Sequence, residues 1–416
     1  MFKLLKQNKI FRVFLAYQFF SSIGSAMFSM FILLSVHLIY ENPIYTGIAG
    51  FLMAAPVMFS VVVGPIVDRG DKVKIMRIST LLEFLVLALL AFTPLSEHLG
   101  VLFMFAVIFA YNIAFLFERP AGTTMLPQIV GENDILQANS VINIVSMLGG
   151  IGIGIVLFAS VGGEIPFSFL YGVSAVFVAL AFICSLFLKN TEAVKSEAGA
   201  SASSYLRDLK QGAKFVKSNV LLFVMIAVVA MGFTGEMAYV SRPMFLEYHV
   251  GAQGYVLFVL MVLVGGVVAS FFVSKLGNRF KLGKFVFVLF MLAAVMRVVF
   301  ALVVPLHLVG ALITVVIFSG LVNVVGMLLR SLNQKIPPKD MVGRVGTIST
   351  TFVAIFVALG ALVGGFLGSV VSDAAHIFIY HGISLAVIGI YILLVPRMRK
   401  LPKMDEIERV ETDDMQ

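Results

Sequence analysis

The sequence predicts an all-α membrane protein with twelve transmembrane helices in two six-helix halves. The first observation behind this prediction is the composition: of 416 residues, 60% are hydrophobic and 12% are charged, and the mean hydropathy is +1.04. Soluble proteins carry about 25% charged residues. A membrane-spanning helix uses about 20 apolar residues, so the chain has enough for roughly a dozen spans and no separate catalytic domain.

The second observation is a series of apolar runs, each long enough to cross a bilayer core about 30 Å thick as a helix. Helices are required because lipid cannot satisfy free backbone groups, and no run alternates as a barrel strand does. The runs lie near residues 13–39, 46–66, 75–94, 99–117, 140–161 and 165–188, and near 220–241, 254–275, 285–304, 307–329, 348–371 and 377–396.

Basic residues give the orientation of these spans. Of 30 Lys and Arg residues, 28 lie at the termini or beside the segments that follow even-numbered runs, and only Arg242 and Arg297 do not. Positive charge is retained in the cytoplasm, so we expect a multi-pass protein of the cell membrane (plasma or inner) with both termini cytoplasmic. The net charge of +8 then reflects orientation and not a nucleic-acid partner. The basic start, Met1–Arg12, lacks an Ala-x-Ala pattern, so we expect a retained first span.

The third observation is an internal repeat at an offset near 210 residues. Asp68-Arg69 recurs as Asn278-Arg279, and the Gly150/Gly154 pair recurs as Gly360/Gly364. Halves with an even number of spans repeat in the same orientation, as in parallel-repeat transporters.

A polar segment divides the two sets of six runs. We therefore expect four parts: a six-helix half, a cytoplasmic linker with a basic amphipathic segment, a second six-helix half, and an acidic disordered tail. Their boundaries are predicted at residues 1–188, 189–219, 220–400 and 401–416.

The segment between the second and third runs carries a motif: Gly64-Pro-Ile-Val-Asp68-Arg69-Gly-Asp-Lys72-Val-Lys74. With it the sequence resembles the major facilitator superfamily, whose pattern is Gly-x-x-x-Asp-Arg followed by a basic cluster. Asp71 stands where many members have a second glycine, as in the branch that includes macrolide-efflux-type proteins. Four further segments are similar to the same branch: Arg119-Pro120-Ala121, Leu126-Pro127, Leu206 to Gly212, and Gly343-Arg344-Val345.

The resemblance implies a secondary transporter that works by alternating access. Its branch implies proton-coupled efflux of amphipathic drugs, macrolide-like, as an antiporter in multidrug resistance, with a small amphipathic substrate, protons and membrane lipids as partners. One departure is Tyr111-Asn112 in the fourth run, where members often have arginine, and another is the absence of proline from Gly149–Gly154. The alternatives are a lipid, lysophospholipid or siderophore transporter of the same superfamily, and a membrane sensor or scaffold that does not transport.

Polar side chains recur at helical spacing on three of the runs, and each series occupies one face of its helix. Such faces avoid lipid and point at each other or at water; the alternative role is interhelical hydrogen bonding. The resemblance places spans 1, 4, 7 and 10 around the substrate cavity. The residues predicted to line it are Gln18, Ser22, Ser25, Tyr111, Asn112, Phe115, Asn143, Tyr239 and Asn323.

Ionisable residues within spans are functional candidates by default. Glu236 is the strongest, with Tyr239 one turn later, because a carboxyl in an apolar cavity can exchange a proton or attract a cationic drug. The alternative for Glu236 is a structural pair with Arg242. Glu83 and Arg297 fall in spans that the resemblance places at the periphery, so we expect structural pairing there. Glu118 is expected to pair locally with Arg119.

Two groups of residues are predicted to control packing and motion. Gly150, Gly154, Gly360 and Gly364 would let helix backbones approach closely. The motif residues Gly64, Asp68, Arg69 and Lys72 would form a conformational latch, because an aspartate can accept from the free amides of a neighbouring helix N-terminus. The alternative is that these charges only fix topology.

Several chemistries have no sequence support. The single cysteine, Cys184, excludes an internal disulfide, and the six histidines lack metal-ligand spacing. No Gly-x₄-Gly-Lys-Ser/Thr loop is present, so we expect no ATP hydrolysis. We predict no cofactor, no metal and no enzymatic activity, and a monomer.

The latch hypothesis predicts that Asp68→Asn leaves the protein inserted in the membrane and slows transport, because the amide loses the charge that favours a helix N-terminus. Insertion is checked by membrane fractionation and transport by counterflow in proteoliposomes. Unchanged turnover would show that Asp68 only helps to set topology.

Overall fold

The computed structural model describes residues 8–93, 100–130, 166–188, 202–338 and 341–409, and six positions between 138 and 149. Within these residues, eleven helices are long and apolar enough to cross a membrane. The predicted all-α membrane fold is therefore confirmed for the described part of the chain. The fifth predicted span, 140–161, lies almost wholly outside it.

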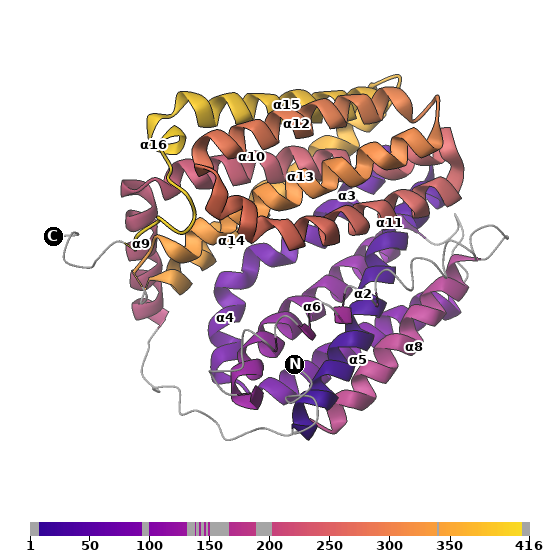
Figure 1. The fold of residues 1–416 in the computed structure, drawn as a ribbon. Coiled ribbons are helices and arrows are strands. Elements are labelled where there is room, and N and C mark those ends of the chain that lie inside the picture. The colour runs from indigo at the N-terminus through magenta and orange to yellow at the C-terminus, as the bar shows by residue number, and fades with distance from the viewer. Residues whose placement is uncertain are drawn as a thin grey trace. The chain divides into compact units, whose positions relative to one another are not determined.

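The chain forms two compact units, Met1–Ala198 and Gly199–Gln416. The division falls inside the predicted linker, 189–219. Figure 1 shows the helices of both units.

Unit 1 is a helix bundle whose first helix has defined ends. Asn8 caps it: the side-chain oxygen accepts from the Phe11 amide at 2.9 Å, and the side-chain amide donates to the Ile129 carbonyl at 2.7 Å. The helix ends at Glu41, in a left-handed conformation with φ 47°. The described helices of unit 1 are α2 (Lys9–Tyr40), α3 (Pro43–Ala54), η1 (Ala55–Phe59), α4 (Ser60–Arg69), α5 (Lys72–Phe92), α6 (Val101–Val130) and α8 (Phe167–Leu186).

The second span is interrupted by a 3-10 turn. Pro56 lies in η1, between α3 and α4, and has no amide hydrogen to donate to the helix ladder. The predicted single run near 46–66 therefore consists of three consecutive helical pieces, α3, η1 and α4. Together they contain the segment Pro43–Gly64, which is long enough to cross the membrane.

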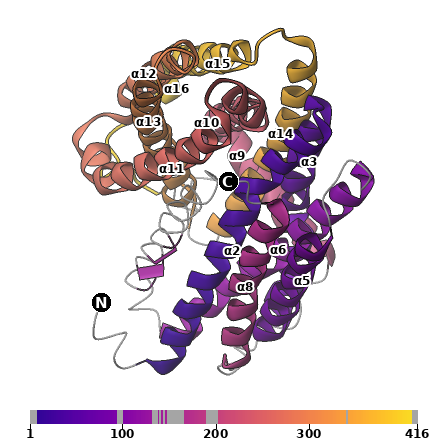
Figure 2. The same cartoon turned by 90° about the vertical axis from the view of Figure 1, so that its right-hand side faces the viewer.

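The α2–α8 seam shows how unit 1 packs, and Figure 2 shows the two helices side by side. A Cβ atom at Gly24 would clash with Val178, so glycine permits the close approach. The Ser174 hydroxyl donates to the Gly24 carbonyl at 2.9 Å, and the Ser35 and Tyr171 hydroxyls are hydrogen-bonded at 2.7 Å. Small residues and hydroxyls thus join helices where no hydrophobic driving force exists between them.

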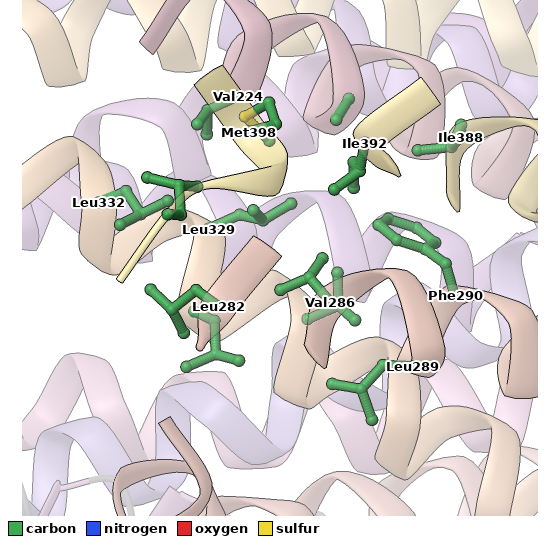
Figure 3. Packing of buried hydrophobic residues seen from close by; sticks show 14 of the residues in the cluster. Val224, Leu282, Val286, Leu289, Phe290, Leu329, Leu332, Ile388, Ile392 and Met398 are labelled. Carbon is green, nitrogen blue, oxygen red and sulfur yellow. The ribbon is translucent and has the colours of Figure 1, made fainter. Parts of the chain in front are cut away.

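Unit 2 is a second helix bundle with a continuous apolar core. Figure 3 shows this core, where Val286 and Phe290 lie among Leu329, Ile388 and Ile392 from neighbouring helices. The helices of unit 2 are α9 (Ala202–Ser218), α10 (Leu221–Val240), α11 (Arg242–Arg279), α12 (Leu282–Val303), α13 (Leu308–Lys335), α14 (Val342–Val370), α15 (Ala375–Leu394) and α16 (Pro396–Arg399).

One of these helices, α11, is broken near its start. Gly251 has φ 67° and ψ 178°, a conformation that residues with a side chain rarely adopt. The membrane-crossing part is therefore Gln253–Val273, and the piece before Gly251 is short.

The helix of the predicted linker packs against α14. The Arg344 guanidinium donates to the Gln211 side-chain oxygen at 3.0 Å. A Cβ at Gly212 would lie 3.1 Å from the Cβ of Arg344, and Phe215 is buried in the core of unit 2. Two sequence motifs more than a hundred residues apart, around Gly212 and Arg344, therefore meet in space.

The prediction of a disordered tail over 401–416 is wrong for its first nine residues. Leu401 is buried, and Ile407 packs against the core of unit 2. The Met404 amide donates to the Gly277 carbonyl at 3.0 Å, and Lys335 donates to the Met404 carbonyl. The acidic tail contains three apolar residues at intervals of three, Leu401, Met404 and Ile407, which pack against the core of unit 2. Residues 410–416 lie outside the described part.

Helices α10 and α14 of unit 2 approach each other closely at two glycines. A Cβ at Gly360 would overlap the Phe233 carbonyl oxygen, and one at Gly364 would overlap the Met237 carbonyl oxygen. Both obstacles are backbone atoms, which cannot move aside without shifting a helix.

This geometry predicts that Gly360→Ala lowers the free energy of unfolding by roughly 1–3 kcal/mol, the usual effect of overpacking. Gly343→Ala is the matched control, because it lies in the same helix and a Cβ there meets nothing within 4 Å. Thermal unfolding of the detergent-solubilised protein measures the difference. Equal unfolding temperatures for the two variants would contradict the close contact.

Candidate functional site

The polar face of α2 is half-buried in unit 1. The Ser22 hydroxyl donates to the Phe19 carbonyl at 2.9 Å, and the Ser25 hydroxyl donates to the Ser22 carbonyl at 3.2 Å. Gln18 lies against Gly122 of α6, where a Cβ would come within 3.0 Å of the Gln18 amide nitrogen. The two serines are thus satisfied by their own helix, which leaves the face free to meet a substrate or another helix.

The three candidates on α6 differ in their surroundings. Tyr111 is buried, and its ring stacks on Phe28 with centroids 3.8 Å apart. The Asn112 side-chain amide donates to the Ile108 carbonyl at 2.8 Å. Asn112 and Phe115 are half-buried, whereas the Tyr111 hydroxyl has no hydrogen-bond partner among the residues that the structure describes.

A hydrogen-bonded group that the sequence did not predict lies beside this face. The Tyr17 hydroxyl donates to Oε1 of Glu118 at 2.5 Å, and the Ser21 hydroxyl donates to the same oxygen at 3.0 Å. Thr80 Oγ1 lies 2.9 Å from the Tyr17 hydroxyl. Side chains of α2, α5 and α6 therefore meet at one buried carboxyl group.

Arg119, with which a local pair was expected, acts on Glu118 electrostatically, but the hydrogen bonds to Glu118 come from α2. Consecutive residues of a helix point about 100° apart, so Glu118 faces the interior, where it is 5% exposed, while Arg119 is exposed. Glu83 is 1% exposed, and neither of its carboxyl oxygens has a hydrogen-bond partner in the described chain.

In unit 2, the candidate Glu236 lies one turn before the end of α10 and is half-buried. Arg242 interacts with it electrostatically. The Arg242 guanidinium lies over the Tyr239 ring, 4.5 Å from its centroid, and 5.2 Å from the centroid of Phe258. A carboxyl, a phenol and a guanidinium from α10 and the start of α11 thus form one polar group in an apolar bundle.

The polar series of α13 faces α11. Ser319 is 4% exposed, and a Cβ at Gly265 would overlap its hydroxyl. Asn323 donates to the Ser319 carbonyl at 2.9 Å, and a Cβ at Gly266 would lie 3.2 Å from the Asn323 amide nitrogen. In this unit the series therefore takes part in helix packing.

Arg297 has aromatic neighbours instead of the structural partner that we expected. It is 1% exposed, and its guanidinium carbon lies 4.5 Å from the centroid of Phe378 and 4.7 Å from that of Phe318. Cation–π attraction of this kind is strongest where the cation is desolvated. His381, which is 4% exposed, also contacts Phe318.

The motif between α4 and α5 contains a helix cap. Oδ1 of Asp71 accepts from the Lys74 amide at 2.8 Å, so Asp71 is the N-cap of α5. One turn later, Arg77 donates to the carbonyls of Ser185 at 3.1 Å and Leu188 at 2.8 Å, at the end of α8. Sequence reasoning assigned the capping carboxylate to Asp68; the signal for Asp71 was its place directly before the first helical residue.

Some predicted residues lie outside the described part of the chain. These are Asn143, Gly150 and Gly154, and the side chains of Asp68 and Arg69. Where side chains are described, no group of three or more His, Cys, Asp or Glu residues could hold a metal ion.

Comparison with protein families gives a match over most of the chain. The family model described as Major Facilitator Superfamily matches residues 13–361.

Comparison with individual proteins finds distant relatives. A Bacillus amyloliquefaciens protein described as the bacilysin exporter BacE is 21% identical over 336 residues, covering 79% of this chain and 82% of its own. The staphyloferrin A transporter of Staphylococcus aureus (strain NCTC 8325 / PS 47) is 24% identical over 293 residues, covering 65% of this chain and 70% of its own.

Solved structures share the fold. A D-xylose-proton symporter superposes with a TM-score of 0.73 at 11% identity, covering 96% of this chain and 99% of its own. The nucleoside transporter NupG superposes with a TM-score of 0.68 at 14% identity, covering 96% of this chain and all of its own, 100%. At these identities the likeness concerns the fold alone.

The cap of α5 predicts that Asp71→Ala lowers the free energy of unfolding by about 1 kcal/mol, because the first turn loses a side-chain acceptor. Asp71→Asn is the matched control, since asparagine caps about as well as aspartate. Chemical denaturation in detergent measures both variants. Equal stability of Asp71→Ala and the wild type would mean that water replaces the cap.

Proposed function

The chain belongs to the Major Facilitator Superfamily, matched over residues 13–361, and from this membership we propose that it exports an amphipathic small molecule in exchange for protons. Membership makes it a multi-pass secondary transporter and not an enzyme. A transported small molecule follows from the family; the identity of that molecule, the direction and the driving ion are our proposal.

Glu236 is the observation that supports coupling to protons in this proposal. It is a half-buried carboxyl inside α10, a helix long and apolar enough to cross a membrane. An ionisable residue in a span is expensive to keep, and transporters use such residues as proton carriers. Arg242 beside it offers a charge with which the carboxylate can pair after the proton leaves.

The direction of transport is supported by a relative. The Bacillus amyloliquefaciens protein is described as an exporter, and the two chains align over 79% of this one. Export also agrees with the resemblance of the sequence to efflux proteins. The macrolide-like substrate rests on that sequence resemblance alone.

Siderophore transport is the second candidate. It is supported by the likeness to the staphyloferrin A transporter, 24% identical over 293 residues. Arg242 is half-buried in unit 2 with an unpartnered Nε among the described residues, and such a guanidinium would attract an acidic substrate. Lipid transport and a non-transporting sensor remain as alternatives that the same assay separates.

We place the protein in the cell membrane as a monomer, with both termini in the cytoplasm. The distribution of Lys and Arg supports this orientation.

A panel in proteoliposomes with an imposed pH gradient tests the function. It contains a macrolide, bacilysin, an iron-free siderophore and a lysophospholipid. Movement of the macrolide or of bacilysin against its gradient, driven by protons, supports drug export. Movement of the siderophore alone favours the second candidate, and movement of none favours a sensor.

Glu236→Gln is expected to abolish pH-driven efflux while substrate binding stays measurable, because glutamine keeps the shape of the acid but carries no exchangeable proton. Glu247→Gln, in the short piece of α11 before the Gly251 break, is the matched control and should transport normally. Uphill transport is compared with equilibrium exchange in the same vesicles. Full proton-driven efflux by Glu236→Gln would rule out this residue as the carrier.

A further inference from the structure

Unit 1 contains a second pair of ionisable groups that the proposed function does not use. We propose that Glu83 and Glu118 form a proton-binding site inside unit 1, with an exchangeable proton on Glu83 while Glu118 is ionised. The site is separate from Glu236, which lies in unit 2, and its existence does not depend on what the protein transports.

Glu118 has the surroundings of a carboxylate. Its Oε1 accepts from Tyr17 at 2.5 Å and from Ser21 at 3.0 Å. Distances of about 2.5–2.7 Å are typical of a hydroxyl that donates to an ionised oxygen. Tyr17 has a single hydrogen, which is directed at Glu118, while Thr80 Oγ1 donates to the Met76 carbonyl at 2.8 Å. Two hydroxyl donors therefore converge on one oxygen that accepts both.

Glu83 has the surroundings of a neutral acid. It is 1% exposed, and neither carboxyl oxygen has a hydrogen-bond partner among the described residues. An ionised carboxylate in that position would lose its hydration and gain nothing in return. Glu83 lies one turn after Thr80 on α5, so it faces the same group of side chains.

The two carboxyl groups interact electrostatically. Two like charges that interact in an apolar interior oppose each other, so ionisation of one carboxyl group disfavours ionisation of the other. The hydrogen bonds decide which one is ionised: Glu118 has donors and Glu83 has none.

Titratable groups that face Glu83 come from two of the neighbouring helices. Tyr17 on α2 and Tyr111 on α6 both interact with it electrostatically. Arg119 on α6 is the cation nearest in sequence; it is exposed and acts on Glu118.

The other helices packed against α5 offer no further charge in the described chain. On α8, Tyr171 is hydrogen-bonded to Ser35, away from the pair. Arg77 lies on α5 itself and is engaged by the carbonyls at the end of α8. No titratable side chain of α4 is described.

The proton step is simple. A hydronium ion gives one proton to a carboxylate oxygen, one O–H bond forms in the acid, and water is released, so the site changes by a single charge. Protonation of Glu83 would remove the charge that opposes the Glu118 carboxylate, which Tyr17 and Ser21 stabilise. Because Tyr17 and Ser21 directly precede Gln18 and Ser22 on α2, the proton site lies on the adjacent face of that helix, about 100° from the polar face expected to meet substrate.

Infrared difference spectroscopy of the full-length protein in lipid nanodiscs tests the site without any transport. Proton is the probe, added by a pH jump from mildly alkaline to mildly acid buffer. The wild type should show the carbonyl band of a buried protonated acid, and Glu83→Gln should lose that band together with a single titrating proton per chain. Glu41→Gln, an exposed carboxyl in the same unit, is the control and should change neither.

Two further variants distinguish loss of the proton site from misfolding of the protein. Glu118→Gln should keep the Glu83 band and shift its titration midpoint, and Tyr17→Phe should shift the midpoint by removing one donor from Glu118. A Glu83→Gln spectrum that keeps both the band and the proton overturns the proposal. So does a midpoint that neither of the other variants moves, or a band that responds to Na⁺ instead of pH.

The outcome is distinguishable from that of the efflux proposal. Glu236→Gln should leave the Glu83 band intact even if it abolishes transport. Conversely, loss of the band in Glu83→Gln supports the site even if the transported molecule proves to be a siderophore.

Discussion

Lipid supplies no hydrogen-bond partner, so every polar group in these spans must find its partner within the protein. Most do so in the simplest way, by bonding to a carbonyl one turn earlier in their own helix. Ser22, Asn112, Thr234 and Asn323 all follow this pattern, at 2.8–2.9 Å. When the side chains of a polar helix face form hydrogen bonds within their own helix, their presence does not show whether that face meets substrate, water or another helix. Ser319 shows the consequence, because its series packs against the glycines of α11.

The informative groups are therefore those that their own helix cannot satisfy. A carboxyl or guanidinium in the bundle interior needs a partner from another helix, an aromatic face or a proton. Arg297 has aromatic faces and Glu118 has two hydroxyls from α2. Glu83 has none of these in the described chain, which leaves a proton as the simplest way to remove its charge.

The sequence was sufficient for properties set by local composition. Apolar runs locate the spans because a helix in lipid is specified by its own residues. Ten of the eleven candidate spans of the described chain begin and end near the predicted runs, and the fourth, Val101–Val130, extends thirteen residues past the predicted end at 117. Contacts between distant helices could not be predicted in this way. Glu118 and Tyr17 are 101 residues apart, and neither sequence segment contains a pattern that predicts contact with the other. The prediction for the tail was wrong for a different reason: the acidic composition drew attention away from Leu401, which is buried, and from Met404 and Ile407, which pack partly buried against the core of unit 2.

Glu236 and Glu83 would hold a proton for opposite electrostatic reasons. Glu236 has a cation beside it, Arg242, so Coulomb attraction favours the ionised form and works against the apolar surroundings. Glu83 has another carboxyl beside it, so repulsion and burial act together in favour of the acid. A change in helix packing that separates Glu236 from Arg242 would promote proton uptake there, whereas one that brings water to Glu83 would promote release. The two units can therefore respond differently to the same pH gradient, although several short segments of their sequences repeat at a common offset.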